Sequence, residues 1–285
     1  MYLGFYVSDI EDINYYKTKW HLKYILTDFY GGVCMKRFFY LTMMVLFAFG
    51  GLLKNEAHAA RYMEDLDRGV VAVYLGGSQV YVGWRMLGTD PTSIGFNIYR
   101  GGTKLNASPI TGSTNYVDNA GSLSSTYRVA AVIGGVEKEL SDPVGVWNDF
   151  YRDIPLQRPA GITTPDGYTC SYSPNDASVG DLDGDGQYEI ILKWDPSNAK
   201  DNAQEGYTGN VYLDAYELDG TLLWRIDLGI NIRAGAHYTQ FMVYDLDNDG
   251  RAEVVCKTAP YTIDGAGNPV LLPGDTLADY RNSVG

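Results

Sequence analysis

The sequence is poor in the residues that cross-link small domains or bind zinc. It contains three cysteines in 285 residues, and only Cys170 and Cys256 lie beyond the first 59 positions. Neither has a second cysteine at the Cys-x-x-Cys spacing, so the sequence predicts no disulfide framework and no zinc site. Two unrelated buried thiols, or one pair formed after export, are both compatible with this spacing.

Positive charge is also scarce. The chain has 22 lysines and arginines against 35 aspartates and glutamates, which gives a formal net charge of −13. A surface of this sign repels a phosphate backbone, so nucleic acid is excluded as a partner. The same excess of acidic residues suits cation binding. Binding of a polyanionic substrate would need a metal ion or local basic residues to offset this negative charge.

The chain has no confident membrane span. Its long apolar run, residues 38–53, follows a basic start at 35–37 and precedes small residues at 57–59. This order predicts a signal peptide over residues 35–59, with a retained membrane anchor as the alternative. Because a signal peptide opens a protein, we expect residues 1–34 to be an untranslated upstream segment. The mature protein would then be secreted, either extracellular or periplasmic or at the cell surface, without stable insertion into a membrane.

The composition favours strands over helices. The chain has 33 glycines and 24 tyrosines, a mixture typical of turn-rich, all-β proteins. Short strands are predicted at residues 80–85, 95–100 and 127–132, and they indicate a small β-sandwich over residues 60–148. Together with Trp84, these strands resemble a fibronectin type III-like module. Such modules mostly support a catalytic unit, so we assign this one no chemistry.

A second domain is expected over residues 149–285. After a proline-rich connection, the sequence changes to longer β segments joined by acidic loops that contain glycine. Residues 210–218 alternate in polarity and end at Asp219-Gly220, and residues 221–228 follow, which predicts a β-hairpin. Such a hairpin is the inner repeat of many propeller blades.

The strongest motif is Asp-Leu-Asp-Gly-Asp-Gly-Gln-Tyr-Glu at residues 181–189, and it recurs as Asp-Leu-Asp-Asn-Asp-Gly-Arg-Ala-Glu at residues 245–253. Side-chain oxygens at positions one, three and five converge when the loop curls, and the glycine at position six permits the turn. A carbonyl at position seven and a carboxylate at position nine close a shell of hard oxygen ligands, which suits calcium (Ca²⁺). The predicted ligands are Asp181, Asp183, Asp185, Gln187 and Glu189, and Asp245, Asp247, Asp249, Arg251 and Glu253.

Two other interpretations of these loops compete with calcium loops between strands. An EF-hand places its bidentate glutamate at position twelve, where this chain has Leu192 and Cys256. Both loops also lead into β-type segments, residues 188–194 and 254–257, rather than into helices. The motifs therefore predict calcium loops between strands, with solvated acidic turns as the metal-free alternative.

A loop and strand unit that repeats indicates propeller blades or solenoid turns. We favour a propeller. A ring needs at least four blades, and the region after Cys170 has room for about two, so we expect the propeller to be truncated in this chain.

Three strings of unusual polar residues carry a family likeness: Ser-Pro-Asn-Asp-Ala-Ser-Val-Gly at 173–180, Lys-Trp-Asp-Pro-Ser-Asn-Ala-Lys-Asp-Asn at 193–202, and Arg-Ala-Gly-Ala-His-Tyr-Thr-Gln-Phe at 233–241. Together they resemble bacterial rhamnogalacturonan lyases of polysaccharide lyase family 11, over residues 61 to about 258. The resemblance implies an eight-bladed propeller that holds several calcium ions. It also implies β-elimination at the bond from rhamnose to O4 of galacturonate in the pectic polysaccharide rhamnogalacturonan I.

The resemblance also suggests site residues. The family pattern places substrate contacts at Asn175 and Asp195, and its candidates for the catalytic base lie beyond residue 285. The base is therefore unknown here, and this fragment alone is expected to be inactive. The chain departs from the pattern at residues 260–262, which read Pro-Tyr-Thr where family members usually have Asp-Gly-Thr, so the conformation of this loop is not carried over.

Two further residues of these strings, His237 and Lys193, carry titratable side chains. His237 lies in a polar loop, where it either contacts metal or substrate or is a structural histidine held by backbone hydrogen bonds. Lys193 follows an apolar strand and could extend its ammonium to solvent. The alternative to a lyase is a non-catalytic calcium-binding propeller for carbohydrate binding or adhesion. We expect a monomer, and the sequence leaves endo and exo action open.

Overall fold

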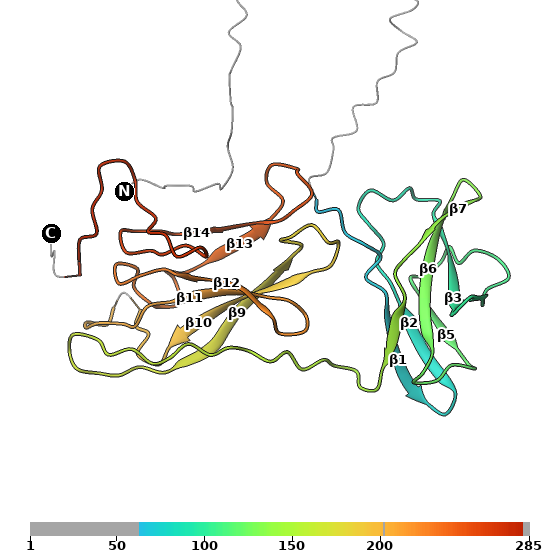
Figure 1. Cartoon of the computed structure of the whole chain (residues 1–285), viewed down its shortest axis with the longest axis horizontal. Helices are drawn as coiled ribbons and strands as arrows, with labels where there is room; N and C mark the ends of the chain where they lie inside the picture. Colours follow the sequence, from blue (N-terminus) through green and yellow to red (C-terminus); the bar gives the residue numbers. More distant parts are fainter. Residues whose placement is uncertain (1–62, 202, 282–285) are drawn as a thin grey trace, which may run out of the picture. The chain divides into compact units, whose positions relative to one another are not determined.

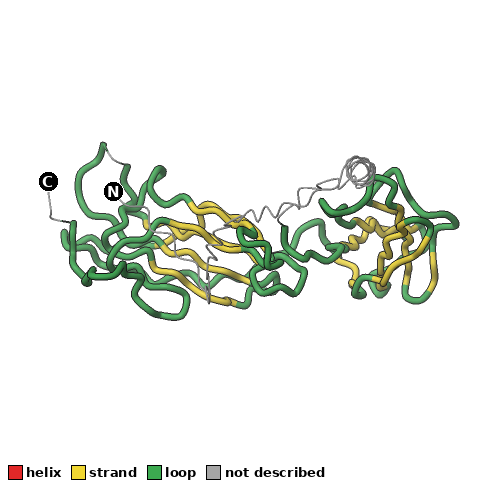
Figure 2. The backbone as a smooth tube through the Cα atoms, turned by 90° about the horizontal axis from the view of Figure 1, so that it is seen from above, coloured by secondary structure: helices red, strands yellow, loops and turns green. Residues whose placement is uncertain are grey.

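The computed structural model describes residues 63–201 and 203–281. The described residues all belong to one compact unit. The predicted upstream segment, residues 1–34, and the predicted signal peptide, residues 35–59, lie outside the described residues. Every regular element in the described part is a strand, so the expected all-β class is confirmed (Figure 2). A membrane-crossing helix is accordingly not found among these residues.

The first eight strands form one sheet (Figure 1). They are β1 (Val71–Gly76), β2 (Gln79–Gly83), β3 (Gly95–Arg100), β4 (Thr103–Lys104), β5 (Asn115–Asp118), β6 (Thr126–Ile133), β7 (Val136–Leu140) and β8 (Val144–Trp147). Their order is β4-β3-β6-β8-β1-β2-β5, with β7 paired to β6. The three strands expected from the sequence correspond to β2, β3 and β6. Strand β8 joins the two halves of the sheet, because it pairs parallel with β1 and antiparallel with β6.

Both halves of this sheet contribute to one apolar core. Side chains alternate along the strands, so every second residue points inward. Val80 and Val82 from β2 and Ile98 and Val129 from β3 and β6 are fully buried in the same cluster. Trp84 packs against Phe96 in this core, with ring centroids 5.3 Å apart.

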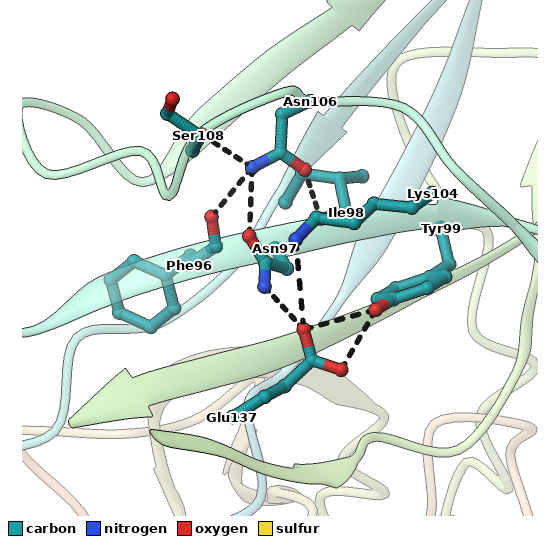
Figure 3. A network of polar contacts seen from close by, with 8 residues as sticks. All are labelled: Phe96, Asn97, Ile98, Tyr99, Lys104, Asn106, Ser108 and Glu137. Atoms are coloured by element: carbon teal, nitrogen blue, oxygen red, sulfur yellow. Dashed lines mark hydrogen bonds and ion pairs between the residues drawn. The ribbon is translucent and has the colours of Figure 1, made fainter. Parts of the chain in front are cut away.

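A polar network fixes the edge of this core (Figure 3). The Asn106 amide accepts a hydrogen bond from the Ile98 backbone N–H at 2.8 Å. Its Nδ2 donates to the side-chain Oδ1 of Asn97 at 3.0 Å. The Glu137 carboxylate on β7 accepts from the Asn97 amide and from the Tyr99 hydroxyl. The network satisfies the buried Asn97 side chain and holds β7 against β3, so its role is structural.

The second sheet is a four-stranded antiparallel meander (Figure 1). Its strands are β9 (Tyr172–Gly180), β10 (Glu189–Pro196), β11 (Tyr212–Tyr216) and β12 (Leu222–Asp227). Strands β11 and β12 form the hairpin expected around Asp219-Gly220, and Gly220 takes a φ of 90°, which favours glycine. A separate hairpin follows, with β13 (Phe241–Tyr244) and β14 (Glu253–Cys256).

The meander is covered on both faces. On one face, Tyr172, Leu192 and Trp194 pack with Cys170. On the other face, Leu213 packs in a second cluster that includes residues of β13 and β14. A central strand that is buried on both sides needs a neighbouring layer on each side. Cys170 and Cys256 are both free thiols, so the pairing that the sequence left open is not formed here.

The loop that departs from the family pattern contains a strained residue. Tyr261 has a φ of 77°, a left-handed conformation that bulky residues rarely adopt. The turn is held in place, because the Thr262 hydroxyl donates to the Leu228 carbonyl at 2.8 Å. A Cβ at Gly229 would lie 2.2 Å from the Tyr261 carbonyl oxygen. The close approach of Gly229 and the buried Thr262 therefore force Tyr261 into a conformation that suits glycine.

Replacing this residue by glycine, Tyr261→Gly, is expected to raise the free energy of unfolding by about 1 kcal/mol. A left-handed conformation costs a non-glycine residue ~1–2 kcal/mol, and the lost burial of a half-exposed ring and the added chain entropy offset part of the gain. Urea denaturation would measure the change. The control Tyr261→Phe keeps the backbone strain and should leave stability nearly unchanged. A loss of stability in the glycine variant would contradict the prediction.

Candidate functional site

Each acidic motif forms the loop of a β-hairpin. The first joins β9 to β10, and the second joins β13 to β14. In both loops the first aspartate comes directly after a strand, and the glutamate at position nine is the first residue of the next strand. The expected context of loops between strands, rather than between helices, is therefore confirmed.

The two loops share one hydrogen-bond pattern. In the first, the Asp181 carboxylate accepts from the backbone N–H groups of Gly184 at 2.6 Å and Gly186 at 2.9 Å. The Glu189 carboxylate accepts from the Leu182 N–H at 2.6 Å. The equivalent bonds recur in the second loop, from Asn248 and Gly250 to Asp245 and from Leu246 to Glu253. The repeated motif thus encodes a repeated geometry.

The loop turns depend on left-handed residues at positions four and six. Gly186 and Gly250 at position six have φ values of 88° and 94°. At position four, Gly184 has a φ of 81° and Asn248 a φ of 64°. Asparagine tolerates this region better than other non-glycine residues, so both sequences reach the same turn.

The turns bring three carboxylates together in each loop. The ligand atoms of Asp181, Asp183 and Glu189 all lie within 4.8 Å of one another, and those of Asp245, Asp247 and Glu253 form an equivalent group. The carboxylates at position five lie outside both groups. Asp185, for example, is exposed and accepts a hydrogen bond from the Gln187 N–H at 2.8 Å. The ligand roles predicted for positions five and seven stay predictions.

The first group has an electrostatic deficit that a cation would relieve. Glu189 is completely buried, and its Oε1 has no hydrogen-bond partner. Burial, together with the nearby Asp183, Glu217 and Asp181 carboxylates, raises the pKa of Glu189 to about 7. Burial and the Asp247 carboxylate raise the pKa of Glu253 in the same direction. An unpaired buried carboxylate oxygen among other carboxylates fits a hard divalent cation, so both groups could hold a metal ion.

The two predicted substrate contacts lie on neighbouring strands. Asn175 is exposed on β9, and Asp195 is half-buried near the end of β10, where it pairs with Ser173. Both lie at the end of the β9–β10 hairpin away from the acidic loop. At ~3.3 Å per residue, the six-residue rise along β10 places Asp195 about 20 Å from the metal loop. The structure therefore separates the predicted substrate contacts from the predicted metal ligands.

A β-bulge lies between these positions. The pairing register of β9 and β10 shifts between Leu192 and Trp194, so Asn175 and Asp176 both lie opposite Lys193. A bulge leaves one residue unpaired and redirects side chains, and bulges are common next to active sites. The idea that Lys193 extends to solvent is wrong: the residue is buried, and its ammonium forms an ion pair with Asp176.

His237 lies in a turn, as expected, and its side chain is 72% exposed. Its Nδ1 lies 2.9 Å from the Asp201 carboxylate. The observed partner of the imidazole is thus an acidic side chain and not the backbone, and the contact uses the ring nitrogen Nδ1. The role of His237 in binding metal or substrate stays a prediction.

The sequence analysis missed a buried network on the opposite face of β10. Asp214 is completely buried, and its carboxylate accepts hydrogen bonds from the Trp194 indole at 2.7 Å and the Tyr216 hydroxyl at 2.5 Å. Arg225 donates to the same carboxylate through Nε and Nη2, both at 2.6 Å. A carboxylate amid apolar residues of a strand was the signal that could have revealed this network.

Two family models match the chain. Residues 61–147 match the rhamnogalacturonan I lyases beta-sheet domain, and residues 151–285 match the C-terminal domain of rhamnogalacturonan lyase family 11. Together they extend over most of the sequence.

Curated relatives agree with these models. The rhamnogalacturonan endolyase YesW of Bacillus subtilis (strain 168) is 58% identical over 248 residues, which cover 86% of this chain and 39% of the relative. The rhamnogalacturonan exolyase YesX of the same organism is 56% identical over 225 residues, covering 79% of this chain and 36% of the relative. The chain thus spans less than half the length of these relatives.

Solved structures are similar as well. The crystal structure of YesW superposes with a TM-score of 0.73 at 61% identity and covers 79% of this chain and 38% of that one. A rhamnogalacturonan lyase of Bacillus licheniformis gives a TM-score of 0.72 at 62% identity, with the same coverage.

Proposed function

The chain belongs to rhamnogalacturonan lyase family 11, and from this premise we propose that the protein is a polysaccharide lyase acting on rhamnogalacturonan I. The observation that carries the proposal is the match of both family models and of two curated lyases to most of the chain. Because the chain spans 39% and 36% of those relatives, the activity is proposed for the whole protein.

The proposed reaction is β-elimination. A base removes the proton from C5 of galacturonate, the C5 electron pair forms the C4–C5 double bond, and the bond from C4 to the glycosidic O4 breaks with the electrons on oxygen. Negative charge builds on the adjacent carboxyl group, and cationic groups stabilise it. Asn175 and Asp195 are proposed to hold the sugar chain, since an amide and a carboxylate can hydrogen-bond its hydroxyls. The base is expected in sequence beyond residue 285, as in the family pattern.

We propose that each acidic loop binds one calcium ion, held by the ligands predicted from the sequence. When bound, Ca²⁺ supplies positive charge that compensates the clustered carboxylates. The support is the convergence of three carboxylates in each loop and the unpartnered Glu189 oxygen. The distance from Asp195 favours a structural role for this calcium.

We further propose the domain division expected from the sequence: a fibronectin type III-like sandwich over residues 60–148 and the first blades of an eight-bladed propeller from residue 149. The meander β9 to β12 has the antiparallel order of a propeller blade, which supports this interpretation.

Secretion to the cell exterior or surface and action as a monomer are proposed as well. The pectic substrate is a large polymer outside the cell, and the predicted signal peptide, which lies outside the described residues, would deliver the enzyme to it. Among the relatives, one is named an endolyase and the other an exolyase at nearly equal identity, so both modes stay open. Neither relative supports the non-catalytic alternative.

An activity assay tests the proposal. We expect the chain, joined at Gly285 to the remaining sequence of the endolyase relative, to release ultraviolet-absorbing unsaturated galacturonate ends from rhamnogalacturonan I and to spare homogalacturonan. The 285-residue chain alone should release few or none. Saturated products from the folded fusion would contradict elimination, since hydrolysis leaves no double bond. Strong activity of the chain alone would contradict the placement of the base beyond residue 285.

A further inference from the structure

Three charged residues lie at or next to the bulge between β9 and β10. The extra residue of the bulge is on β9, where Asn175 and Asp176 both lie opposite Lys193 of β10. Asp195 follows two residues after Lys193 on the same strand, so both side chains point to the same face of the sheet. The order of charges across this face is therefore negative, positive, negative.

The three groups differ in their access to water. The side chain of Lys193 is 5% exposed, whereas that of Asp176 is 67% exposed. A buried ammonium is costly unless acidic groups surround it. The exposed Asp176 carboxylate would remain well solvated without this pair. Lys193 also has a second acidic neighbour, since the half-buried Asp195 lies two residues further along the same face of β10.

Asp195 is the group whose charge most needs support. Among residues 63–201 and 203–281, no group donates a hydrogen bond to its carboxylate, and Lys193 is the cation that acts on it. Burial raises the pKa of Asp195, and the negative charge of Asp176 raises it further. The positive charge of Lys193 lowers the pKa of Asp195 and so opposes these two effects. From β11, the residues that pair with this part of β10 are Tyr212 and Leu213, and neither carries charge at neutral pH.

We propose that Lys193 is a positioning residue that keeps the Asp195 carboxylate ionised and available as a hydrogen-bond acceptor for the sugar chain. The proposal rests on the proposed function in one respect, the contact of Asp195 with the polysaccharide. An ionised carboxylate accepts at both oxygens, whereas a protonated one presents a donor and fewer acceptors. Sugar hydroxyls donate more strongly to the charged form. The ammonium also reduces the net charge of the three groups to −1, which limits repulsion of a polymer that carries carboxylates.

The ionisation of Asp195 can be measured on the 285-residue chain without any activity. Carbon-13 labelling of aspartate carboxyl groups and NMR titration would give its titration midpoint, with Asp195→Asn identifying the signal. Lys193→Met keeps the length and the apolar part of the side chain and is expected to raise the midpoint by about one pH unit, the lower end of the effect of an opposite charge nearby. Lys193→Arg keeps the charge and should hold the midpoint near that of the unaltered protein.

Asp176→Asn is the matched control, because it removes a charge of the opposite sign from the same bulge. It is expected to lower the midpoint of Asp195, since a like charge is lost while Lys193 remains. A merely structural role of the pair would shift both variants in the same direction. An unchanged midpoint in Lys193→Met, or a shift of the same sign in Lys193→Met and Asp176→Asn, overturns the proposal.

A second measurement separates this inference from the proposed function. In the lyase fusion, the acidic limb of the pH profile of kcat/KM should move upward in Lys193→Met by the same interval as the NMR midpoint. It should return in Lys193→Arg. If the unaltered fusion releases no unsaturated products, the proposed function fails, while the NMR result still decides the charge relation of Lys193 and Asp195. If activity is present and the limb does not move, the positioning role fails.

Discussion

Removal of calcium by a chelator is expected to lower the melting temperature of the protein by about 10–20 °C. Each acidic loop brings three carboxylates within 4.8 Å of one another, and the loop loses its compensating charge when the ion leaves. A ligand at ~100 times its Kd stabilises the native state by about 2.7 kcal/mol per site, so two sites contribute about 5 kcal/mol. For a folded region of this size, each kcal/mol corresponds to ~2–4 °C.

Variants assign the effect to the individual loops. Asp181→Asn and Asp245→Asn each remove one completely buried carboxylate from a loop, and each should abolish about half of the calcium-dependent shift in a thermal melt. The exposed Asp142 lies outside both loops, so Asp142→Asn serves as the matched control and should keep the full shift. A melting temperature that does not respond to chelator would rule out structural calcium in these loops.

The sequence allowed the regular parts of the fold to be predicted because local signals determine them. The hairpin of β11 and β12 follows from the alternation of its residues and from Asp219-Gly220 at its turn. The acidic loops follow from the spacing of carboxylates and glycines, since backbone N–H groups at fixed positions need acceptors. The same spacing produced the same hydrogen bonds in both loops, although their other residues differ.

The contacts around Lys193 and Asp214 could not be predicted, because each depends on a β-bulge. The register of β11 and β12 shifts between Ala215 and Tyr216. Counting residues from the turn would pair Asp214 with Trp224, but because of the shift Asp214 pairs with Arg225. The register of β9 and β10 shifts at Lys193 in the same manner. A shift of one residue exchanges which side chains meet, and no local signal in these strands marks either bulge.

The buried carboxylate of Asp214 links the strand that carries Lys193 and Asp195 to the rest of the sheet. The carboxylate pairs with the guanidinium of Arg225. It also accepts a hydrogen bond from the indole N–H of Trp194, which lies between Lys193 and Asp195 on β10. Arg225 donates further to the backbone carbonyl of Gln157. Loss of this carboxylate would remove an acceptor from three residues, Trp194, Tyr216 and Arg225. The first two of these belong to the core of the meander.

Asp214→Ala is therefore expected to lower the free energy of unfolding by about 3–5 kcal/mol, the usual cost of breaking a buried charge pair by removing one partner. The side chain of Arg225 retains 29% exposure, so water can solvate part of the orphaned guanidinium and the result should fall near 3 kcal/mol. Urea denaturation would measure it. In the double variant Asp214→Ala with Arg225→Met, the unpaired charge is gone, and we expect part of the loss to be recovered, which a double-mutant cycle reports as a positive coupling. A loss below 1 kcal/mol in the single variant, or none recovered in the double variant, would mean that packing and not this pair stabilises the meander.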